Sequence, residues 1–518
     1  MPQTGLHGGA EILVGYGIAV AGLLIGSFLA RARLRRLMLT PLLAVAVLIV
    51  SAVLWSVVLW ADPRLTALAR GTIQIYGFVF TLAVALVAGI ALGARKPGVT
   101  HKRGTVLADG VLSGRSLFRP GDELALAGQP IPRADETKHF KLIGTTGTGK
   151  STAIRELLKG AIERGDRAVI ADPDGSYLKA LYNAARGDAI LNPFNERAAR
   201  WDLFAEVIQL HDADQLARSL IPDHEGSDRS WRHYARTFVT AIVRQLHRVD
   251  EHDLAKLYYL LIMAPVDELR ELLEPTPAGP FLGSDNGKFF ESVRSVANVH
   301  VAALEHLASQ TTGPLFSVRK WVREGRGVLF LPYRASEIAA LRYIVSTWMR
   351  LGIFEAMNGP EGDQRLWFIV DELDALGAID GLKDALARLR KFGGRCVLGF
   401  QSIAQVRGTY GDAEAQTIVE NCGNTLILRC SASERGGTAE FASRLIGKRE
   451  IVRSQVSHNL PGAFAGSGAH RTKTLSDQHV TEDAVMASEI EQLPDLTGFL
   501  KLASRPEWRR VQLRADQD

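Results

Sequence analysis

One octapeptide constrains the fold of this chain more than any other stretch. Residues 144–151 read Gly-Thr-Thr-Gly-Thr-Gly-Lys-Ser, which is the G-x-x-x-x-G-K-S pattern of a phosphate-binding loop. Residues 139–143 before it suit a buried strand, and residues 152–159 after it suit a helix. The pattern depends on that context, because the loop must bring its backbone N–H groups and a helix N-terminus to one anion. It therefore predicts an α/β fold of the P-loop class.

The residues of this loop have distinct predicted roles. The glycine-rich part brings backbone N–H groups to the phosphates, Lys150 reaches the β- and γ-phosphates, and the Ser151 hydroxyl ligates Mg²⁺. The alternative is a glycine- and threonine-rich loop without a ligand, but the lysine, the hydroxyl and both flanks disfavour it. We assign the nucleotide contacts to Gly144, Thr145, Thr146, Gly147, Thr148, Gly149, Lys150, Ser151 and Thr152.

Length and composition set broad limits on the rest of the chain. At 518 residues it exceeds one ordinary core, so two or three domains are expected. A net charge of +5 permits contact with nucleic acid but does not indicate it. The three cysteines have no metal-ligand spacing and are odd in number, so we expect core thiols in a reducing compartment rather than disulfides.

The first hundred residues contain long apolar runs. Each is close to the ~20 residues that cross a bilayer, although one of them could instead be a buried or interfacial helix. A cleaved signal peptide is not expected, because residues 1–11 contain no lysine or arginine. The runs are residues 12–30, 39–60 and 72–94.

Basic residues flank these runs and predict their orientation. Four arginines lie within residues 31–36, and four lysines or arginines lie within 95–103. Basic flanks favour the cytoplasmic side of a membrane. Both clusters lie inside if the N-terminus and the link 61–71 lie outside, which places the P-loop in the cytoplasm.

A second motif completes the predicted nucleotide site. Residues 365–370 form an apolar strand that ends in Asp371 and Glu372, the Walker B pattern. Asp371 is expected to hold Mg²⁺ through water, and Glu372 to polarise the attacking water. An acidic pair after a strand is weak evidence alone, but it is strong evidence downstream of a P-loop.

Two polar residues near the next strand extend this site. Gln401 follows the strand 395–400 and could sense the γ-phosphate, or it could simply be a hydrogen-bonded polar cap. Arg390 lies on the predicted helix 382–391 and could be an arginine finger for a neighbouring subunit. The pattern alone favours a solvated helix charge for Arg390.

Several other segments have more than one possible interpretation. The Asp172 turn after strand 167–171 either faces the nucleotide site or is a plain turn. Trp231 is either a core anchor, which composition favours, or part of an exposed functional face. The basic and aromatic segment 319–323 suits DNA contact or an amphipathic helix end equally well. Residues 452–481 are rich in Ser, Gly and His and predict a flexible or extended loop, whereas 488–511 are expected to pack back on the α/β domain.

Three runs carry a family resemblance. They read Ala-Arg-Leu-Arg-Lys-Phe-Gly-Gly at 387–394, Gly-Phe-Gln-Ser-Ile-Ala-Gln at 399–405 and Ser-Glu-Ile-Glu-Gln-Leu-Pro-Asp-Leu-Thr-Gly at 488–498. The chain resembles the TraD/TrwB coupling proteins of conjugative type IV secretion in these runs and in the order of its motifs, from about residue 104 onward. It departs from them in having three apolar runs, where the family usually has two anchor helices.

The resemblance implies a RecA-like P-loop NTPase domain with an all-α insertion domain and an N-terminal transmembrane anchor. It further implies a DNA-stimulated ATPase that uses ATP and Mg²⁺ and forms a homo-hexamer at the bacterial inner membrane. Lys150, Glu372, Arg390 and Gln401 match the family's catalytic positions, with Arg390 as arginine finger, and Ser151 and Asp371 match the metal positions. The domains expected are an anchor at 1–103, a first nucleotide-binding part at 104–200, the insertion at 201–312 and a second nucleotide-binding part at 313–518.

The implied partners are single- and double-stranded DNA without sequence preference, relaxase proteins and the type IV secretion channel. Two other functions remain alternatives. An FtsK-like translocase of double-stranded DNA shares the anchor and the core, but the sequence lacks a long linker and a C-terminal DNA-reading domain. A docking receptor for protein substrates, with secondary ATPase activity, could use the large helical insertion.

Overall fold

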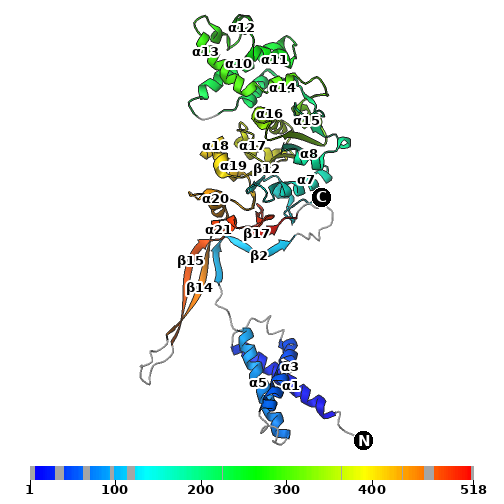
Figure 1. Ribbon diagram of the computed structural model, residues 1–518, viewed down its shortest axis with the longest axis vertical. Helices are drawn as coiled ribbons and strands as arrows, with labels where there is room; N and C mark the ends of the chain where they lie inside the picture. Colours follow the sequence, from blue (N-terminus) through cyan, green and yellow to red (C-terminus); the bar gives the residue numbers. More distant parts are fainter. Residues whose placement is uncertain are drawn as a thin grey trace. The chain divides into compact units, whose positions relative to one another are not determined.

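A ten-stranded sheet forms the centre of the larger unit of the computed structural model (Figure 1). The chain divides into two units, residues 1–102 with 450–480 and residues 103–449 with 481–518. The structure describes residues 6–29, 40–61, 70–93, 99–113, 123–223, 226–362, 364–434, 436–459 and 472–514.

The sheet brings the predicted motifs to one edge. Its strands are parallel from β13 to β7, and β16 joins them antiparallel. Phe400 pairs with Ile143 and Val370 with Leu398, so the residues after β5, β12 and β11 emerge together. The predicted α/β fold is confirmed, and most strands of its sheet are parallel. In spatial order the strands are β2 (Val106–Ser113), β17 (Glu507–Gln512), β16 (Thr497–Lys501), β13 (Asn424–Ile427), β5 (Phe140–Ile143), β12 (Gly394–Phe400), β11 (Leu366–Val370), β6 (Arg167–Pro173), β10 (Val328–Tyr333) and β7 (Ala189–Ile190).

Side chains of the strands alternate between two cores. Leu142 packs in the core that contains Leu157 of α7 (Lys150–Glu163), whereas Ile143 enters the core that contains Trp348 of α16 (Ile338–Ala356). Both cores are fully buried, as are the three cysteines expected there. The P-loop is therefore held between a strand and a helix whose apolar faces lie in one core.

Helices make up the insertion, as predicted. They share the core of α16 and the sheet, and in Figure 1 they gather at the end of this unit away from β2 and β17. The described residues between 202 and 314 contain no strand. The insertion contains α9 (Leu210–Leu220), α10 (Arg229–Arg248), α11 (Leu254–Ile262), α12 (Val266–Leu273), α13 (Gly287–Val301) and α14 (Leu304–Ala308).

A buried carboxylate joins the insertion to the sheet domain. Glu206 accepts hydrogen bonds from Trp201 Nε1 at 2.9 Å and from the backbone N–H of Val318 at 2.7 Å, so it caps α15 (Val318–Glu324). On that helix Arg319 is buried against Asp212 at 2.5 Å. Trp321 is also buried, so its ring has no exposed face on which DNA bases could stack. The segment 319–323 is therefore part of an amphipathic helix.

A β-hairpin replaces most of the loop predicted at 452–481. β14 (Lys448–Asn459) pairs with β15 (Thr472–Asp483), and β1 (Val99–Gly104) completes the sheet in the order β1-β14-β15. The loop prediction is wrong for these strands, and residues 460–471 lie outside the described residues. These strands could not be predicted from the sequence, because they lack the regular apolar alternation that marks a half-buried strand. Hydrogen bonds between their backbones hold the hairpin together instead.

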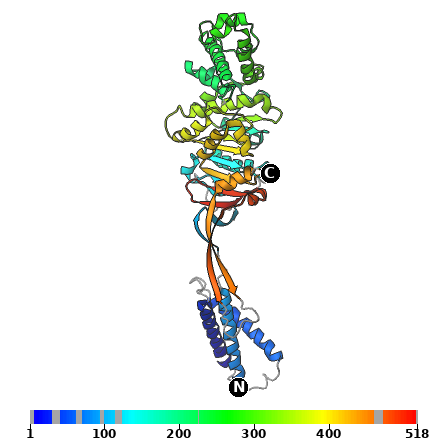
Figure 2. The ribbon, with the colours of Figure 1, turned by 90° about the vertical axis from the view of Figure 1, so that its left-hand side faces the viewer.

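The C-terminal segment returns to the sheet, as expected. α21 (Ala487–Glu491) is followed by β16 and β17, and β17 pairs in parallel with β2. The small β-rich region before the P-loop consists of β2 and the hairpin of β3 (Ala125–Leu126) and β4 (Gln129–Pro130). Figure 2 shows the C-terminal strands, in red, beside the blue strand β2 in this unit.

The described residues of the N-terminal region form three apolar helices. They are α1 (Leu6–Leu29), α3 (Thr40–Ala61) and α5 (Arg70–Gly93). α3 and residues Thr72–Ile90 of α5 are long and apolar enough to cross a membrane, whereas the described apolar part of α1, Glu11–Ser27, is shorter. Two of the three predicted spans thus meet the length and composition of a membrane helix.

Small residues let α1 and α5 pack closely in parallel. Gln74 hydrogen-bonds Glu11 at 2.7 Å, and further along the pair a Cβ on Gly89 would meet the backbone oxygen of Leu23 at 2.6 Å. Glycines at such a seam allow the backbones of two helices to touch. Because the helices are parallel, their N-terminal ends lie on the same side of this bundle.

Candidate nucleotide site

The P-loop forms the turn that its glycines predict. Gly149 begins α7 with φ 111°, and a Cβ there would meet Leu496 at 2.8 Å, so only glycine fits. The backbone N–H of Leu496 donates to Thr148 O at 3.0 Å, which places the C-terminal segment against the loop. The loop is thus held by its own helix on one side and by residues from near the end of the chain on the other.

Lys150 is turned back onto the loop. Its Nζ donates to Gly144 O at 2.6 Å and to Thr145 O at 3.3 Å. Burial lowers the pKa of Lys150, while the nearby carboxylates of Asp371 and Glu372 oppose that change. A buried ammonium satisfied only by carbonyl oxygens can exchange them for phosphate oxygens, which carry full negative charge.

Asp371 lies beside the loop and fits a metal role. Its Oδ2 accepts hydrogen bonds from Ser151 Oγ at 2.6 Å and from Tyr177 Oη at 2.8 Å. Its Oδ1 is buried and has no partner among the described residues. A hard cation such as Mg²⁺ prefers carboxylate, hydroxyl and water oxygens, so this donor set suits the ion.

Glu372 is connected to the P-loop through Gln401. Gln401 Nε2 donates to Glu372 Oε1 at 2.9 Å, and Thr146 Oγ1 donates to Gln401 Oε1 at 2.9 Å. Burial raises the pKa of Glu372, and the neighbouring Asp371 adds to the rise, while the bond from Gln401 opposes it. The glutamine therefore touches both the loop and the acid, which is where a residue that senses the γ-phosphate must lie.

Arg390 lies at the other edge of the sheet. It is exposed and lines a cavity of about 270 Å³ with His139 and Glu420, next to the start of β5 rather than its end. The other predicted site residues are brought together at the carboxyl ends of the strands, and Arg390 is not. Its side chain is consequently available to another molecule rather than to the P-loop of its own chain.

His139 connects the start of β5 to the helix that precedes Arg390. The backbone N–H of Cys396 donates to Nδ1 at 3.1 Å, so Nε2 carries the proton and donates to the backbone oxygen of Leu386 at 2.9 Å. Leu386 belongs to α17 (Leu382–Leu389). Burial lowers the pKa of His139 to about 4, and the positive charges of Arg390 and Arg395 add to the effect.

Acid should weaken the fold through His139. The unfolded chain binds a proton below the ordinary pKa of 6.5, whereas the folded chain does so only below about 4. The free energy of unfolding therefore falls as pH drops from 6.5 towards 4, by on the order of 3 kcal/mol at most. Thermal melting of the full-length protein across this range should show the fall, and His139→Gln, which cannot be protonated, should reduce it.

The matched control is His211→Gln, because His211 is exposed on α9. This variant should melt with the same pH dependence as the unaltered protein. If the melting temperature of His139→Gln falls with pH as steeply as that of the unaltered protein, other groups cause the acid sensitivity.

Sequence reasoning missed Tyr177 and left the role of Asp172 open. Tyr177, on α8 (Ser176–Leu181), hydrogen-bonds Asp371, but no recognised sequence motif includes it. Asp172 is fully buried and accepts from the backbone N–H groups of Tyr177 and Leu178, so the turn after β6 does face this site. An acid at a strand end was the only available signal for it.

Trp231 lies outside this site, in a cluster of aromatic rings on the insertion. Its ring centroid lies 5.6 Å from Phe289 and 6.1 Å from Tyr234. The side chain is half-buried, so the expected core role is met only in part. The rest of the ring faces the surface.

The strand order, the P-loop and the acids at one sheet edge define a RecA-like P-loop NTPase with an all-α insertion. The family described as the type IV secretion-system coupling protein DNA-binding domain matches residues 123–514. The chain belongs to the type IV secretion-system coupling proteins. The resemblance seen in the sequence is confirmed, and it disfavours the double-strand translocase alternative.

Individual relatives agree with this assignment. The chain is 31% identical to coupling protein TraD of Escherichia coli (strain K12) over 397 residues, which are 75% of this chain and 54% of TraD. It is 27% identical to the type IV secretion system-coupling protein VirD4 of Bartonella quintana, over 52% of this chain and 44% of VirD4. The chain thus spans about half the length of these curated relatives.

Solved structures of the plasmid coupling protein TrwB match as well. TrwB in complex with the ATP analogue ADPNP has a TM-score of 0.70 and 31% identity, covering 81% of this chain and 95% of TrwB. TrwB in complex with ADP and Mg²⁺ has the same TM-score and identity, covering 82% and 96%.

Proposed function

We propose that this chain is a membrane-anchored ATPase that couples relaxase-bound DNA to a type IV secretion channel and drives its transfer. The observation that carries the proposal is the meeting of Ser151, Asp371, Glu372 and Gln401 at the end of a P-loop strand. Family membership supplies the context of conjugative secretion.

ATP and Mg²⁺ are the proposed cofactors. Residues 144–152 cradle the phosphates, Lys150 leaves its carbonyl partners for phosphate oxygens, and Ser151 and Asp371 hold the ion. The ion supplies charge neutralisation to the phosphates when bound. Glu372 orients and deprotonates the attacking water, and its raised pKa suits a general base. The TrwB complexes with ADPNP and with ADP and Mg²⁺ support this assignment.

The active form is a homo-hexameric ring in which Arg390 completes the site of a neighbour. Support comes from its exposure at the sheet edge opposite the P-loop. The proposed domains are the anchor at 1–103, the motor at 104–200 and 313–518, and the insertion at 201–312. The insertion is the proposed contact for relaxase and other protein substrates.

The anchor places the motor on the cytoplasmic side of the bacterial inner membrane as a multi-pass protein with its N-terminus outside. The two helices that satisfy the length of a span, α3 and α5, support anchoring. An N-terminus outside requires α1 to cross as a third span, and its parallel packing on α5 supports this. DNA, single- or double-stranded, is bound without sequence preference through its phosphates, and the family's DNA-binding domain supports this partner.

A transfer assay tests the proposal. A donor strain that lacks its own coupling gene is complemented with the full-length chain or with Lys150→Ala, and plasmid transfer to recipients is counted. Lys150→Ala should reduce transfer to the level of the uncomplemented strain, because the phosphate-binding charge is lost. Lys159→Ala, an exposed lysine on the same helix, should transfer normally. Normal transfer by Lys150→Ala would refute a role for this P-loop.

A further inference from the structure

Two buried tyrosines that the P-loop and Walker B motifs do not include lie near the carboxyl ends of β6 and β10. Tyr177 is fully buried and donates its hydroxyl to Asp371 Oδ2 at 2.8 Å, on the same oxygen that accepts from Ser151 at 2.6 Å. Oδ2 is therefore held by two donors, while Oδ1 has no partner among the described residues. This arrangement fixes the orientation of the carboxylate and leaves one oxygen free.

Tyr177 is itself held in place by Asp172. The Asp172 carboxylate accepts from the backbone N–H of Tyr177 at 3.0 Å and from that of Leu178 at 2.7 Å. These bonds satisfy the first turn of α8, which otherwise has free N–H groups. The tyrosine thus points at Asp371 from a short helix that is fastened to the end of β6.

Tyr333 is the second of these buried tyrosines. It ends β10 and pairs with Pro173 at the end of β6, so it belongs to the same sheet edge. Its side chain is 4% exposed, and its hydroxyl has no partner in the described part of the chain. Burial raises the pKa of Tyr333, and the charges of Glu372 and Asp371 act in the same direction.

Buried hydroxyls without partners are uncommon in native proteins. Here two buried oxygens without partners, Asp371 Oδ1 and Tyr333 Oη, lie at one edge of the sheet. Mg²⁺ keeps several of its waters when it binds to proteins, and each water needs acceptors and donors around it. Groups that orient a metal ligand or its waters affect metal affinity even though they do not touch the metal.

We propose that Tyr177 and Tyr333 are positioning residues for the magnesium ion of the nucleotide: Tyr177 orients Asp371, and Tyr333 offers its hydroxyl to the water shell of the ion. The inference rests on the proposed binding of ATP and Mg²⁺. It adds two residues that set how much nucleotide affinity depends on the metal.

Binding of a fluorescent ATP analogue to the full-length protein tests this, first in EDTA and then with increasing Mg²⁺. Tyr177→Phe should raise the Mg²⁺ concentration at half-maximal binding about tenfold, the lower end of what loss of an outer hydrogen bond costs a metal site. Affinity in EDTA should not change, because the loop contacts remain. Tyr333→Phe should shift the Mg²⁺ dependence in the same direction by less.

Tyr182→Phe is the matched control, since Tyr182 ends the same helix and is half-buried, with its ring against Arg197 rather than the acids. It should behave like the unaltered protein. A Tyr177→Phe curve that overlays the unaltered one overturns the inference and leaves the proposed function standing. Equal losses with and without Mg²⁺ also overturn it, because they indicate a structural role. Failure of the unaltered protein to bind the analogue at all would instead refute the proposed function.

Discussion

Replacing Glu372 with glutamine is expected to stop ATP hydrolysis while ATP still binds. The amide keeps the size of the side chain and can still bond Gln401, but it cannot take a proton from water. General-base catalysis contributes about 10²- to 10⁴-fold, so turnover should fall by that factor. Phosphate release by the full-length protein measures the rate, and a fluorescent ATP analogue measures binding.

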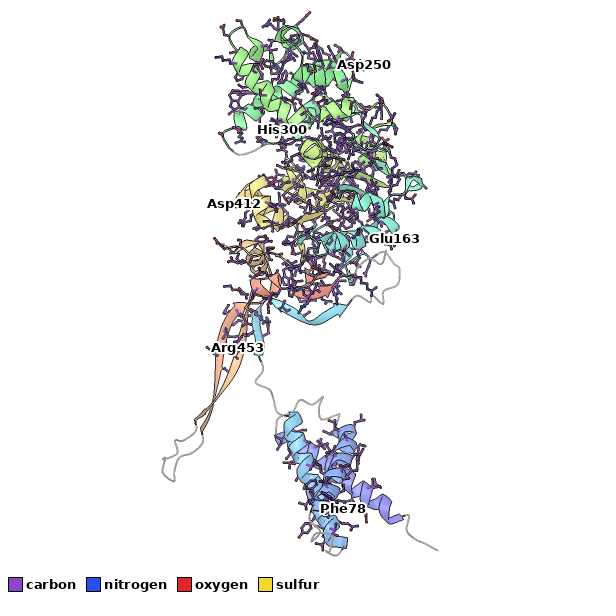
Figure 3. All side chains as sticks on the ribbon, viewed as in Figure 1. Phe78, Glu163, Asp250, His300, Asp412 and Arg453 are labelled. Atoms are coloured by element: carbon purple, nitrogen blue, oxygen red, sulfur yellow. The ribbon has the colours of Figure 1, made fainter. Side chains whose placement is uncertain are left out.

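Glu163→Gln is the control for this substitution. Glu163 is the last residue of α7 and lies exposed at the surface, where Figure 3 labels it. Its hydrolysis rate should equal that of the unaltered protein. If Glu372→Gln hydrolyses ATP at the normal rate, the base lies elsewhere, and Asp374, whose pKa burial also raises, becomes the candidate.

Arg390→Ala is expected to lower hydrolysis by about 10³- to 10⁵-fold, the contribution of an arginine finger. Arg390 lies at the edge of the sheet away from its own P-loop, so we expect it to act on the P-loop of a neighbouring subunit. Mixing Arg390→Ala with Lys150→Ala subunits should restore part of the activity. In a mixed ring, an intact P-loop of the first variant can receive the intact arginine of the second.

Arg388→Ala is the control for the finger, since Arg388 is an exposed arginine near the end of α17, two residues before Arg390. Its rings should hydrolyse ATP normally. An inactive mixture of the two defective variants, under conditions where the subunits assemble together, would show that Arg390 does not act across a subunit boundary.

The parts of the site that could be predicted from sequence follow strands directly. Asp371 and Gln401 directly follow β11 and β12, and Lys150 ends the loop that follows β5. Parallel strands bring such ends together without further information. Tyr177 and Tyr333 could not be predicted in this way. One belongs to a helix and the other ends a strand two places from β11, so only the spatial order of the sheet brings them to the same ends of the strands as Asp371.

The fold shows the same division. Buried strands with strong apolar patterns were predictable within a few residues, as with β11 and β12. The hairpin of β14 and β15 was not, since backbone pairing rather than apolar alternation forms it. Arg390 could be assigned to a finger only through family resemblance, because its position on the sheet follows from tertiary structure.

Steady-state ATP hydrolysis by the full-length protein, titrated with single-stranded DNA, tests most directly whether this P-loop drives DNA movement. DNA should raise the rate in the unaltered protein and not in Lys150→Ala, and the stimulation should weaken steeply with added salt, because phosphate contacts release counterions. Hydrolysis that depends on Lys150 but is unchanged by DNA at low salt would contradict a DNA motor.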